Sequence, residues 1–584
     1  MVIPAAIRFV LALLVLGAAV APRIAAQPAA DTARRHMIAA SHAMAAEAGL
    51  AVLRAGGSAV DAAIAAQAML TLVEPQSSGI GGGALLLHWN ATDRTLDAWD
   101  GRETAPAAAT PTLFLRDGGP MAFADAATGG RPVGVPGAMR MLEAAHRAHG
   151  RLPWPRLFDA AIVAAEAGFI VSPRLAAAIA GQAARLAADP DGAGALYLLP
   201  DGSPVPAGHR LRNPALAATL RALAEQGAEA LHRGPIAAAM VAAVRGDARN
   251  PGLLAMEDLA AYAPVRRAAL CGPYRAVIVC GFPPPSSGGV ATLQILGILR
   301  HQDMAALDPR GADHAHMLIE AGRLAFADRN RYLADSDHVA VPVAGLLERF
   351  YLGLRAQLVD RAGALPVSGL RAGNPLRDGA ASVPARPLLS PQLPQPERGT
   401  AHLSVVDAAG NVVSITTTVE AGFGSGLVVG GFVLNNQLTD FSFLPAREGW
   451  PVANRAGPGK RPRSSMSPTI VFDAAGAPVL ALGSAGGERI IGHVAQALVA
   501  IIDNGLSPEA ALALPRVAGV HAAAELEAGT GAASLGAALE ARGFPVLVAP
   551  NRSGLQVIGI ARTPEGLVLR GAADPRREGI VLGD

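Results

Sequence analysis

A proline-rich segment that gives way abruptly to a hydrophobic hairpin pattern is the feature that most constrains the fold of this chain. Residues 378–399 contain five prolines and no sustained apolar periodicity. Because proline lacks the amide donor that a core helix or strand needs, we expect this segment to be exposed and mobile. Two runs rich in β-branched residues follow, 400–407 and 412–420, with a turn sequence between them. This pattern predicts a buried β-hairpin directly after an exposed segment.

The boundary between the two segments, Gly399-Thr400, places a hydroxyl residue directly after a glycine. A precursor can cut its own chain at such a boundary. Cleavage would leave Thr400 as a new N-terminus that carries both a nucleophilic hydroxyl and a basic amine. The simpler interpretation is a linker followed by an ordinary hairpin, and this stretch alone leaves both open.

Composition excludes two classes of protein. Hydrophobic residues make up 51% of the 584 residues and charged residues 16%, but much of the apolar content is alanine, which indicates packed helices. Past the N-terminus, no apolar run reaches the roughly 18–20 residues that span a bilayer. A net charge of +2 and an aromatic content of 4% give no basis for nucleic-acid binding.

The N-terminus has the pattern of a secretory signal peptide. Residues 1–8 carry one positive side chain, residues 9–21 are apolar, and small residues for cleavage follow at Ala25-Ala26. We therefore predict a signal peptide over residues 1–26 and export, with the periplasm as the expected compartment; a buried N-terminal helix is the alternative. Export would permit a disulfide between Cys271 and Cys280, but two unpaired buried cysteines fit the sequence equally well.

Periodicity predicts alternating helical and strand-rich regions. Helical patterns cover residues 37–73 with a break at Gly56-Gly57, most of 137–245, 314–332 and 488–502. Ser58 and Asp61 fit a helix N-cap with an acidic first turn. Strand patterns cover residues 84–89, 95–99, 276–280 and much of 401–482. This order predicts a layered α+β or sandwich fold.

Two glycine clusters invite functional interpretations. Residues 79–84 formally match a dinucleotide-binding fingerprint, but a helix precedes them and a strand follows, so a tight turn is favoured. Residues 483–489 lie between a strand and a helix. There, the backbone amides of Gly486 and Gly487 could hold a developing oxyanion, although a plain strand-to-helix turn is the simpler interpretation.

The hairpin and its neighbours supply candidate site residues. A three-residue loop at 409–411 would pair Ala408 with Val412 and put Thr400, Thr418 and Glu420 on one face. A two-residue loop would put Thr418 on the other face, and the sequence leaves both registers open. Polar residues also gather next to other strands, where they could bind the carboxylate and the ammonium of an amino acid. The candidates for the carboxylate are Arg102, Ser464 and Ser465, and those for the ammonium are Gln437 and Asp440.

Taken together, these stretches resemble the γ-glutamyltransferases (glutathione hydrolases), which are N-terminal-nucleophile hydrolases. The matching stretches are 55–65, 73–83, 100–106, 283–289, 399–407, 434–442, 459–471 and 483–491, in family order. The resemblance implies a four-layer αββα sandwich of the N-terminal-nucleophile hydrolase type. It also implies self-cleavage between Gly399 and Thr400 into a large chain, 27–399, and a small chain, 400–584, that form a heterodimer.

The resemblance further implies a role for each matching residue. Thr400 would be the nucleophile, Thr418 its hydrogen-bonding partner, and Gly486 with Gly487 the oxyanion hole. Arg102, Ser464 and Ser465 match the family's α-carboxylate binders. Gln437 and Asp440 match its α-amino binders, with Glu420 at a further position of that set. The expected substrates are a γ-glutamyl donor such as glutathione and water or an amino acid or peptide acceptor, without a metal or another cofactor.

Three departures from the family pattern bear on specificity. Glu420 stands where many relatives have asparagine, Ala401 replaces the second threonine of a pair, and residues 441–463 are short for a lid and lack tyrosine. Two alternatives therefore stay open: an acylase of the same family that removes glutaryl-type side chains from cephalosporins, and a secreted binding protein on the same fold that is never cut.

Overall fold

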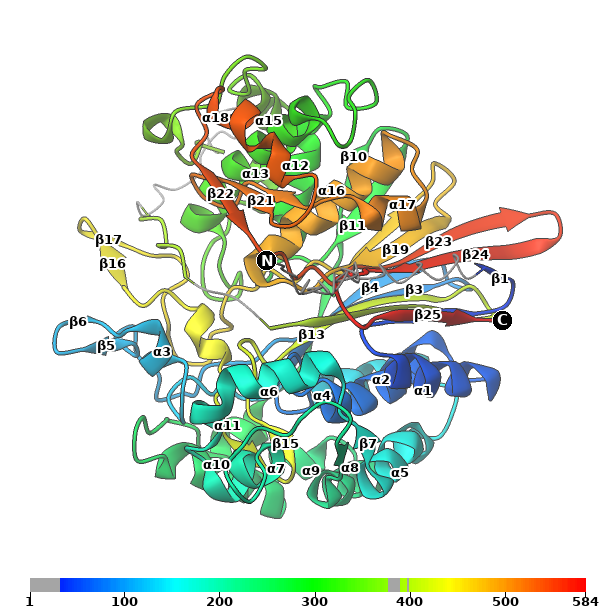
Figure 1. Cartoon of the computed structure of the whole chain (residues 1–584), viewed down its shortest axis with the longest axis vertical. Coiled ribbons are helices and arrows are strands. Elements are labelled where there is room, and N and C mark those ends of the chain that lie inside the picture. The colour runs from blue at the N-terminus through cyan, green and yellow to red at the C-terminus, as the bar shows by residue number, and fades with distance from the viewer. Residues whose placement is uncertain (1–31, 376–388, 396–398) are drawn as a thin grey trace, which may run out of the picture.

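Two seven-stranded antiparallel sheets lie face to face in the computed structural model, which describes residues 32–375, 389–395 and 399–584 (Figure 1). The first sheet has the order β25 (Ile580–Gly583), β2 (Met37–Ala40), β12 (Ala401–Val406), β13 (Val412–Thr418), β3 (Gly83–Asn90), β4 (Thr95–Gly101) and β9 (Val265–Ala268). The second has the order β1 (Thr32–Ala33), β24 (Gly566–Ala573), β23 (Gln556–Thr563), β19 (Pro478–Gly483), β18 (Thr469–Phe472), β11 (Val277–Gly281) and β10 (Leu270–Tyr274).

Helices cover the outer face of each sheet (Figure 1). The layer on the first sheet contains α1 (Ala43–Arg54), α2 (Ala59–Val73), α4 (Ala138–His149), α5 (Asp159–Ala167), α6 (Pro173–Leu186), α8 (Pro214–Gln226) and α10 (Gly234–Gly246). The layer on the second contains α12 (Gly288–Leu299), α13 (Ala312–Tyr332), α15 (Arg349–Ala356), α16 (Ile490–Ile502), α17 (Pro508–Ala513) and α18 (Gly536–Glu540). The predicted four-layer αββα sandwich is therefore confirmed.

Short elements occupy the connections. The short helices are α3 (Phe123–Ala126), α7 (Ala195–Tyr197), α9 (Glu229–His232), α11 (Met256–Ala261) and α14 (Val343–Leu346). The short strands are β5 (Leu115–Arg116), β6 (Gly119–Pro120), β7 (Phe169–Ile170), β8 (Arg210–Leu211), β14 (Val428–Val429), β15 (Phe432–Val433), β16 (Ala446–Arg447), β17 (Trp450–Pro451), β20 (Val517–Ala518), β21 (Ala524–Glu527) and β22 (Val546–Ala549). The β16–β17 hairpin, which lies in the region compared with a lid, projects from the molecule (Figure 1).

Strand β3 shows how the sequence builds these layers. Its side chains alternate: Leu85 and Leu87 belong to the apolar core between the sheets, whereas Ala84 and Leu86 belong to the core beneath the first helical layer. A strand buried on both faces needs apolar residues at every position rather than at every second one. The unbroken run ALLL in β3 is the sequence signature of this burial.

The expectation of helix over residues 37–73 is wrong at its start. Residues Met37–Ala40 form the buried strand β2, which pairs with β12 on one side and β25 on the other. Strand pairing with distant segments outweighs the helical pattern of this short run. The predicted helix start at Ser58 is confirmed, since the Ser58 and Asp61 side chains form a capping box at the start of α2.

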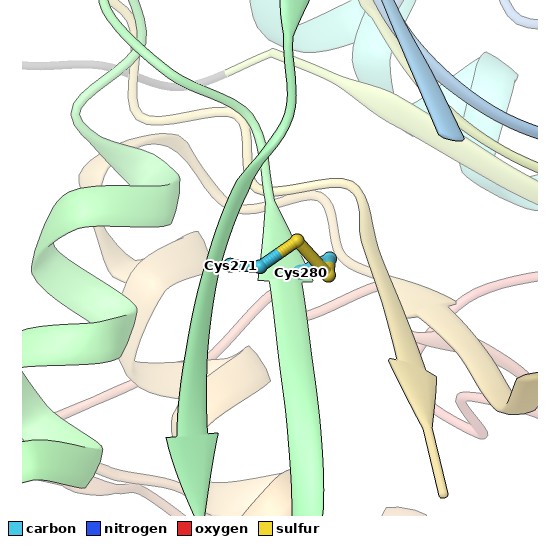
Figure 2. Close-up of a disulfide and its surroundings, with 2 residues drawn as sticks. All are labelled: Cys271 and Cys280. Atoms are coloured by element: carbon cyan, nitrogen blue, oxygen red, sulfur yellow. A yellow bond between two sulfur atoms is a disulfide. The ribbon is translucent and has the colours of Figure 1, made fainter. Parts of the chain in front are cut away.

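The two cysteines form a disulfide, which settles the alternative that the sequence left open (Figure 2). Residues 270–281 make an antiparallel hairpin of β10 and β11, in which Cys271 and Cys280 are directly opposite each other. The chain turns back between them at residues 275–276. The run between the cysteines is therefore two strands rather than one.

We expect reduction of this disulfide to lower stability modestly. The bond closes a loop of sequence separation 9, and loop-closure entropy for so short a loop is worth about 2.6 kcal/mol. Dithiothreitol should lower the thermal unfolding midpoint of the wild-type protein. It should leave the midpoint of the Cys271→Ser/Cys280→Ser double variant unchanged. An equal shift in both proteins would show that the reductant acts elsewhere.

Within the described residues, no helix is both long and apolar enough to cross a membrane. The predicted signal peptide, residues 1–26, lies outside the described part of the chain. Export to the periplasm therefore stays a prediction.

Candidate active site

A single pocket at the end of the β12–β13 hairpin gathers residues from widely separated parts of the sequence. Its lining consists of Gly399, Thr400, Thr418, Glu420, Gln437, Asp440, Ser464, Ser465, Met466, Gly487 and Ile490. Of the residues predicted to form the site, Arg102 and Gly486 do not line this pocket, and the other nine do. The hairpin thus lies where the candidate nucleophile and the candidate binding residues meet.

The register of the hairpin differs from the expected one. Ala401 is opposite Thr417 and Val406 is opposite Val412, so Thr400 comes opposite Thr418 rather than Glu420. The loop has the expected three residues but begins one residue earlier. Gly410 takes its last position with a φ of +82°, the left-handed conformation that such loops require there. The Asp407 carboxylate fixes the turn by accepting from the amides of Ala409 and Asn411.

This register brings two hydroxyl groups to the Gly399 carbonyl. Thr418 Oγ1 donates to Gly399 O at 2.7 Å, and Thr400 Oγ1 also donates to that oxygen. The Thr418 hydroxyl in turn accepts from the Glu420 amide at 2.8 Å. An oxygen that accepts from the Thr418 hydroxyl is polarised, which makes the Gly399 carbonyl carbon more electrophilic.

Gly399 and Gly82 are needed because backbone approaches them closely. A Cβ atom at Gly399 would lie 2.1 Å from the Glu420 carbonyl oxygen, and one at Gly82 would lie 2.0 Å from the Thr418 carbonyl oxygen. The first cluster of glycines, residues 79–83, is thus a turn that feeds strand β3 and packs against the end of β13. This confirms the turn that we favoured over a dinucleotide site.

The second glycine cluster lies between β19 and α16. Gly486 and Gly487 have φ values of +135° and +63°, a conformation that side chains disfavour. Gly487 lines the pocket together with Thr400. Gly486 lies behind it, where a Cβ atom would come within 2.8 Å of the His493 ring. Burial lowers the pKa of His493 to about 3, so this ring is neutral.

Arg102 lies behind Asp440 rather than in the lining of the pocket. It is fully buried and forms an ion pair with the Asp440 carboxylate, and its Nε donates to Pro462 O at 3.1 Å. Burial raises the pKa of the neighbouring Glu103 to about 8, although the Arg102 charge opposes this rise. Near neutral pH, Glu103 is therefore largely protonated and Asp440 is the charged partner of Arg102.

Acidic and amide groups line one end of the pocket. Gln437 Nε2 donates to Asp440 Oδ2 at 3.1 Å, and Thr439 Oγ1 donates to Glu420 Oε2 at 3.4 Å. Glu420 is buried and has a φ of +77°, just past the end of β13. Two carboxylates and an amide around one small volume form a site that suits an ammonium group.

Two serines line the pocket together with these groups, and an arginine that sequence reasoning missed holds one of them. Ser465 Oγ accepts from Arg329 Nη2 at 2.5 Å, and Arg329 Nε donates to Ser287 Oγ at 2.9 Å. Ser464 Oγ accepts from the Met466 amide at 3.0 Å. Arg329 lies in the last turn of α13, where a helical pattern gave no sign of a site residue.

A second missed arginine contacts the candidate nucleophile. Arg577 Nη1 donates to the Thr400 carbonyl oxygen at 2.8 Å, and its Nε donates to Arg552 O at 3.0 Å. It belongs to the connection between β24 and β25, nearly the last residues of the chain. Its only sequence signal is a short basic run, RRE, that fits any exposed turn.

The pocket is almost filled while Gly399 lines it. About 20 Å³ is open to a water molecule, enough for about one water. A glutamyl-sized group therefore requires that the segment before Thr400 move away. In the described part of the chain, His88, Asp97 and His149 could together hold a metal ion, but none of them lines this pocket.

Comparisons with known proteins identify the family to which the chain belongs. A family model described as gamma-glutamyltranspeptidase matches residues 45–583. The glutathione hydrolase proenzyme of Bacillus subtilis (strain 168) is 36% identical over 492 residues, which cover 83% of this chain and 81% of that protein. The acylase ACY 1 proenzyme of Pseudomonas sp. (strain V22) is also 36% identical, over 557 residues that cover 94% and 93%. The crystal structure of cephalosporin acylase from Bacillus halodurans superposes with a TM-score of 0.82 at 28% identity, covering 97% of this chain and 99% of that one.

Proposed function

Since the chain belongs to the gamma-glutamyltranspeptidase family and is an enzyme of the N-terminal-nucleophile type, we propose that it cuts itself between Gly399 and Thr400 and then hydrolyses or transfers γ-glutamyl groups with Thr400 as its nucleophile. The single observation that carries this proposal is the pocket in which the Gly399–Thr400 pair, a second threonine hydroxyl and a carboxylate-rich end come together. Its steps use groups of this chain and no metal or other cofactor.

Self-cleavage begins at the Gly399 carbonyl. The Thr400 hydroxyl attacks the carbonyl carbon and gives up its proton, the C–N bond breaks, and the Thr400 nitrogen takes up that proton and leaves as a free amine. The product is an ester between Gly399 and Thr400 Oγ1. The hydrogen bond from Thr418 to the Gly399 oxygen supports this attack, because it stabilises the negative charge that develops there. Water then hydrolyses the ester and leaves the Gly399 carboxylate and an intact Thr400 hydroxyl.

The same threonine then serves catalysis. An α-amino group has a pKa of about 7.7–8.0, so near neutral pH part of it is unprotonated and can take the proton of the adjacent hydroxyl. Thr400 Oγ1 attacks the γ-carbonyl of the donor, and the backbone amides of the Gly486-Gly487 turn bind the oxyanion. The leaving amine takes the proton, and a γ-glutamyl ester remains. Attack by water gives glutamate, and attack by an amine gives a new γ-glutamyl amide.

The other lining residues would recognise the α-carbon of the donor. Glu420, Gln437 and Asp440 present acceptors to an ammonium group, while Ser464 and Ser465 present hydroxyls to a carboxylate. Because Arg102 is paired with Asp440, we propose that it positions this acidic end and adds positive charge behind the carboxylate subsite. A donor with both an α-amine and an α-carboxylate satisfies the whole set.

A glutaryl-type acylase is the second candidate, and the fit to the Bacillus halodurans cephalosporin acylase favours it. A glutaryl group has the length of a γ-glutamyl group but lacks the α-amine. The carboxylates of Glu420 and Asp440 would then face an uncharged methylene group in place of the ammonium of a γ-glutamyl donor, and the charge-assisted hydrogen bonds to that ammonium would be lost. The acidic end of the pocket therefore favours the γ-glutamyl donor.

The two proposed chains, 27–399 and 400–584, would stay together after cleavage. Strand β12 of the small chain lies between β2 of the large chain and β13, and β13 pairs with β3 of the large chain. Both chains thus contribute strands to one sheet, and separating them would expose its backbone and core. We propose a heterodimer in the periplasm.

Purified protein tests both halves of the proposal. A denaturing gel should show two chains, and N-terminal sequencing of the smaller one should begin at Thr400. Glutathione should release glutamate, and adding an acceptor dipeptide should divert the acyl group to a γ-glutamyl peptide. A γ-glutamyl anilide should be cleaved faster than a glutaryl anilide. A single chain that persists after long incubation would instead support an uncleaved binding protein.

A further inference from the structure

We propose that a second cavity, lined with arginines, binds a carboxylate carried by the amine half of the reaction, which is the leaving group of the donor or the incoming acceptor. The inference rests on the proposed function. The cavity has a volume of about 550 Å³, much more than the pocket around Thr400. Four arginines line it: Arg323, Arg331, Arg371 and Arg447. We call it the arginine cavity.

The arginine cavity adjoins the catalytic pocket. Between the two lies a narrow cleft that shares Asn330 and Gln392 with the arginine cavity and Asp440 with the catalytic pocket. His521, in the wall of the arginine cavity, pairs at 2.9 Å with Glu488, the residue that follows Gly487. The cleft has no room for a water molecule in this structure, so a substrate that reacts at Thr400 and extends past this turn would reach the arginines only after the side chains that line the cleft move.

The charge of the arginine cavity is not balanced by its own walls. Among the described residues that line it, Glu448 is the one carboxylate, and Arg323 is neutralised from outside by Glu320. No ion pair connects Arg331, Arg371 or Arg447 to a carboxylate in the described part of the chain. An anionic group would thus enter a cavity with a net positive charge, as a carboxylate needs.

Arg331 gives the most specific indication of a ligand. Its Nε is buried and has no hydrogen-bond partner among the described residues, and its guanidinium lies 5.5 Å from the centre of the Tyr332 ring. Arg371 Nε donates to Ser368 O, and Arg447 Nη1 donates to Pro391 O, each at 3.2 Å. A guanidinium has five N–H donors, so both arginines keep donors for a ligand.

The arginines come from elements that hold them in place. Arg331 lies in the last turn of α13, two residues after Arg329, the residue that holds Ser465 in the catalytic pocket. Arg447 lies on the projecting β16–β17 hairpin (Figure 1). Arg331 thus lies on the same helical turn as the arginine that holds Ser465 of the carboxylate subsite. A carboxylate bound in the arginine cavity would align the amine for transfer at Thr400.

Two matched pairs of substrates test the inference. The donors are L-γ-glutamyl-4-nitroanilide and its 3-carboxy derivative, and the acceptors are glycylglycine and glycylglycine amide. Arg331→Gln should lower kcat/KM for the carboxylated anilide about 10-fold and leave the uncharged anilide within about 2-fold. Arg447→Gln should act in the same direction. If kcat/KM falls for glycylglycine alone, the arginine cavity binds the acceptor. If kcat/KM falls for the carboxylated anilide alone, the cavity binds the leaving group of the donor.

The control variant is Arg156→Gln, which removes the same charge from an exposed arginine of the other helical layer. It should leave kcat/KM for all four substrates unchanged. If Arg331→Gln lowers kcat/KM equally for both members of each pair, or for no substrate, the inference is overturned while the proposed function stands. If the wild-type enzyme cleaves neither anilide, the proposed function fails. Calorimetry can then still test the inference. The affinity for glycylglycine and for glycylglycine amide, measured with the wild type and with Arg331→Gln, decides whether the arginine cavity binds a carboxylate.

Discussion

Replacing Thr400 with alanine should leave one uncut chain without γ-glutamyl hydrolase activity. The substitution removes the only hydroxyl that can attack the Gly399 carbonyl from the adjacent residue, so the ester cannot form. It also removes the acyl acceptor of catalysis, and loss of a covalent nucleophile typically costs about 10⁴-fold or more. A denaturing gel measures the first effect, and initial rates on L-γ-glutamyl-4-nitroanilide measure the second.

Two control variants separate this loss of chemistry from damage to the hairpin. Thr417→Ala changes the neighbouring strand, where the Thr417 hydroxyl is buried without a hydrogen-bond partner among the described residues. This variant should be cut normally. Thr400→Ser keeps a hydroxyl and should be cut, with lower activity. If Thr400→Ala protein still separates into two chains, the proposed bond is wrong; if it is uncut but melts far below wild type, the hairpin has been disrupted.

The hairpin shows how far sequence reasoning reached and where it stopped. The two runs rich in β-branched residues predicted β12 and β13, and the loop length was also correct. The register was wrong by two positions because the sequence offers two places for the loop. Gly410 with φ > 0 and the Asp407 carboxylate decide between them. An even shift keeps side chains on the same face, so Thr400 and Thr418 still share one side of the sheet.

Sequence reasoning missed two residues that contact the site from distant parts of the sequence. Arg329 and Arg577 approach Ser465 and Thr400 from a helix and from a connection, and no local pattern relates a residue of α13 to a turn near residue 465. The glycines of the site were easier to find. A position that a neighbouring backbone approaches closely, or that has a positive φ, favours glycine, and such glycines stand out in the sequence at 82, 399 and 487. Arg102 was a candidate because it follows a predicted strand, and the resemblance to a family supported it, but only the structure puts it behind Asp440.

We propose that the acidic end of the pocket selects the acyl group, and the charge balance of this end makes the proposal testable. Arg102 lies between two carboxylic acids, Asp440 and Glu103. Burial raises the pKa of Glu103 to about 8, and the negative charge of Asp440 contributes to the rise. If Asp440 becomes neutral, that contribution disappears and Glu103 ionises more readily. Burial, the largest cause of the raised pKa, still acts on Glu103, so its easier ionisation would offset the loss of the Asp440 charge beside Arg102 only in part.

Asp440→Asn should lower activity on γ-glutamyl substrates and leave activity on glutaryl substrates unchanged. The α-ammonium of a γ-glutamyl donor loses a charged hydrogen-bond partner, which is worth about 3 kcal/mol in a buried site, so kcat/KM for a γ-glutamyl anilide should fall about 100-fold. A glutaryl anilide has no ammonium and should be cleaved as well as by the wild-type enzyme. Activity on the glutaryl substrate also verifies that the variant was cut and that Thr400 is intact. Equal losses on both substrates would mean that Asp440 supports the nucleophile rather than the ammonium, and the γ-glutamyl specificity would then have to rest on Glu420.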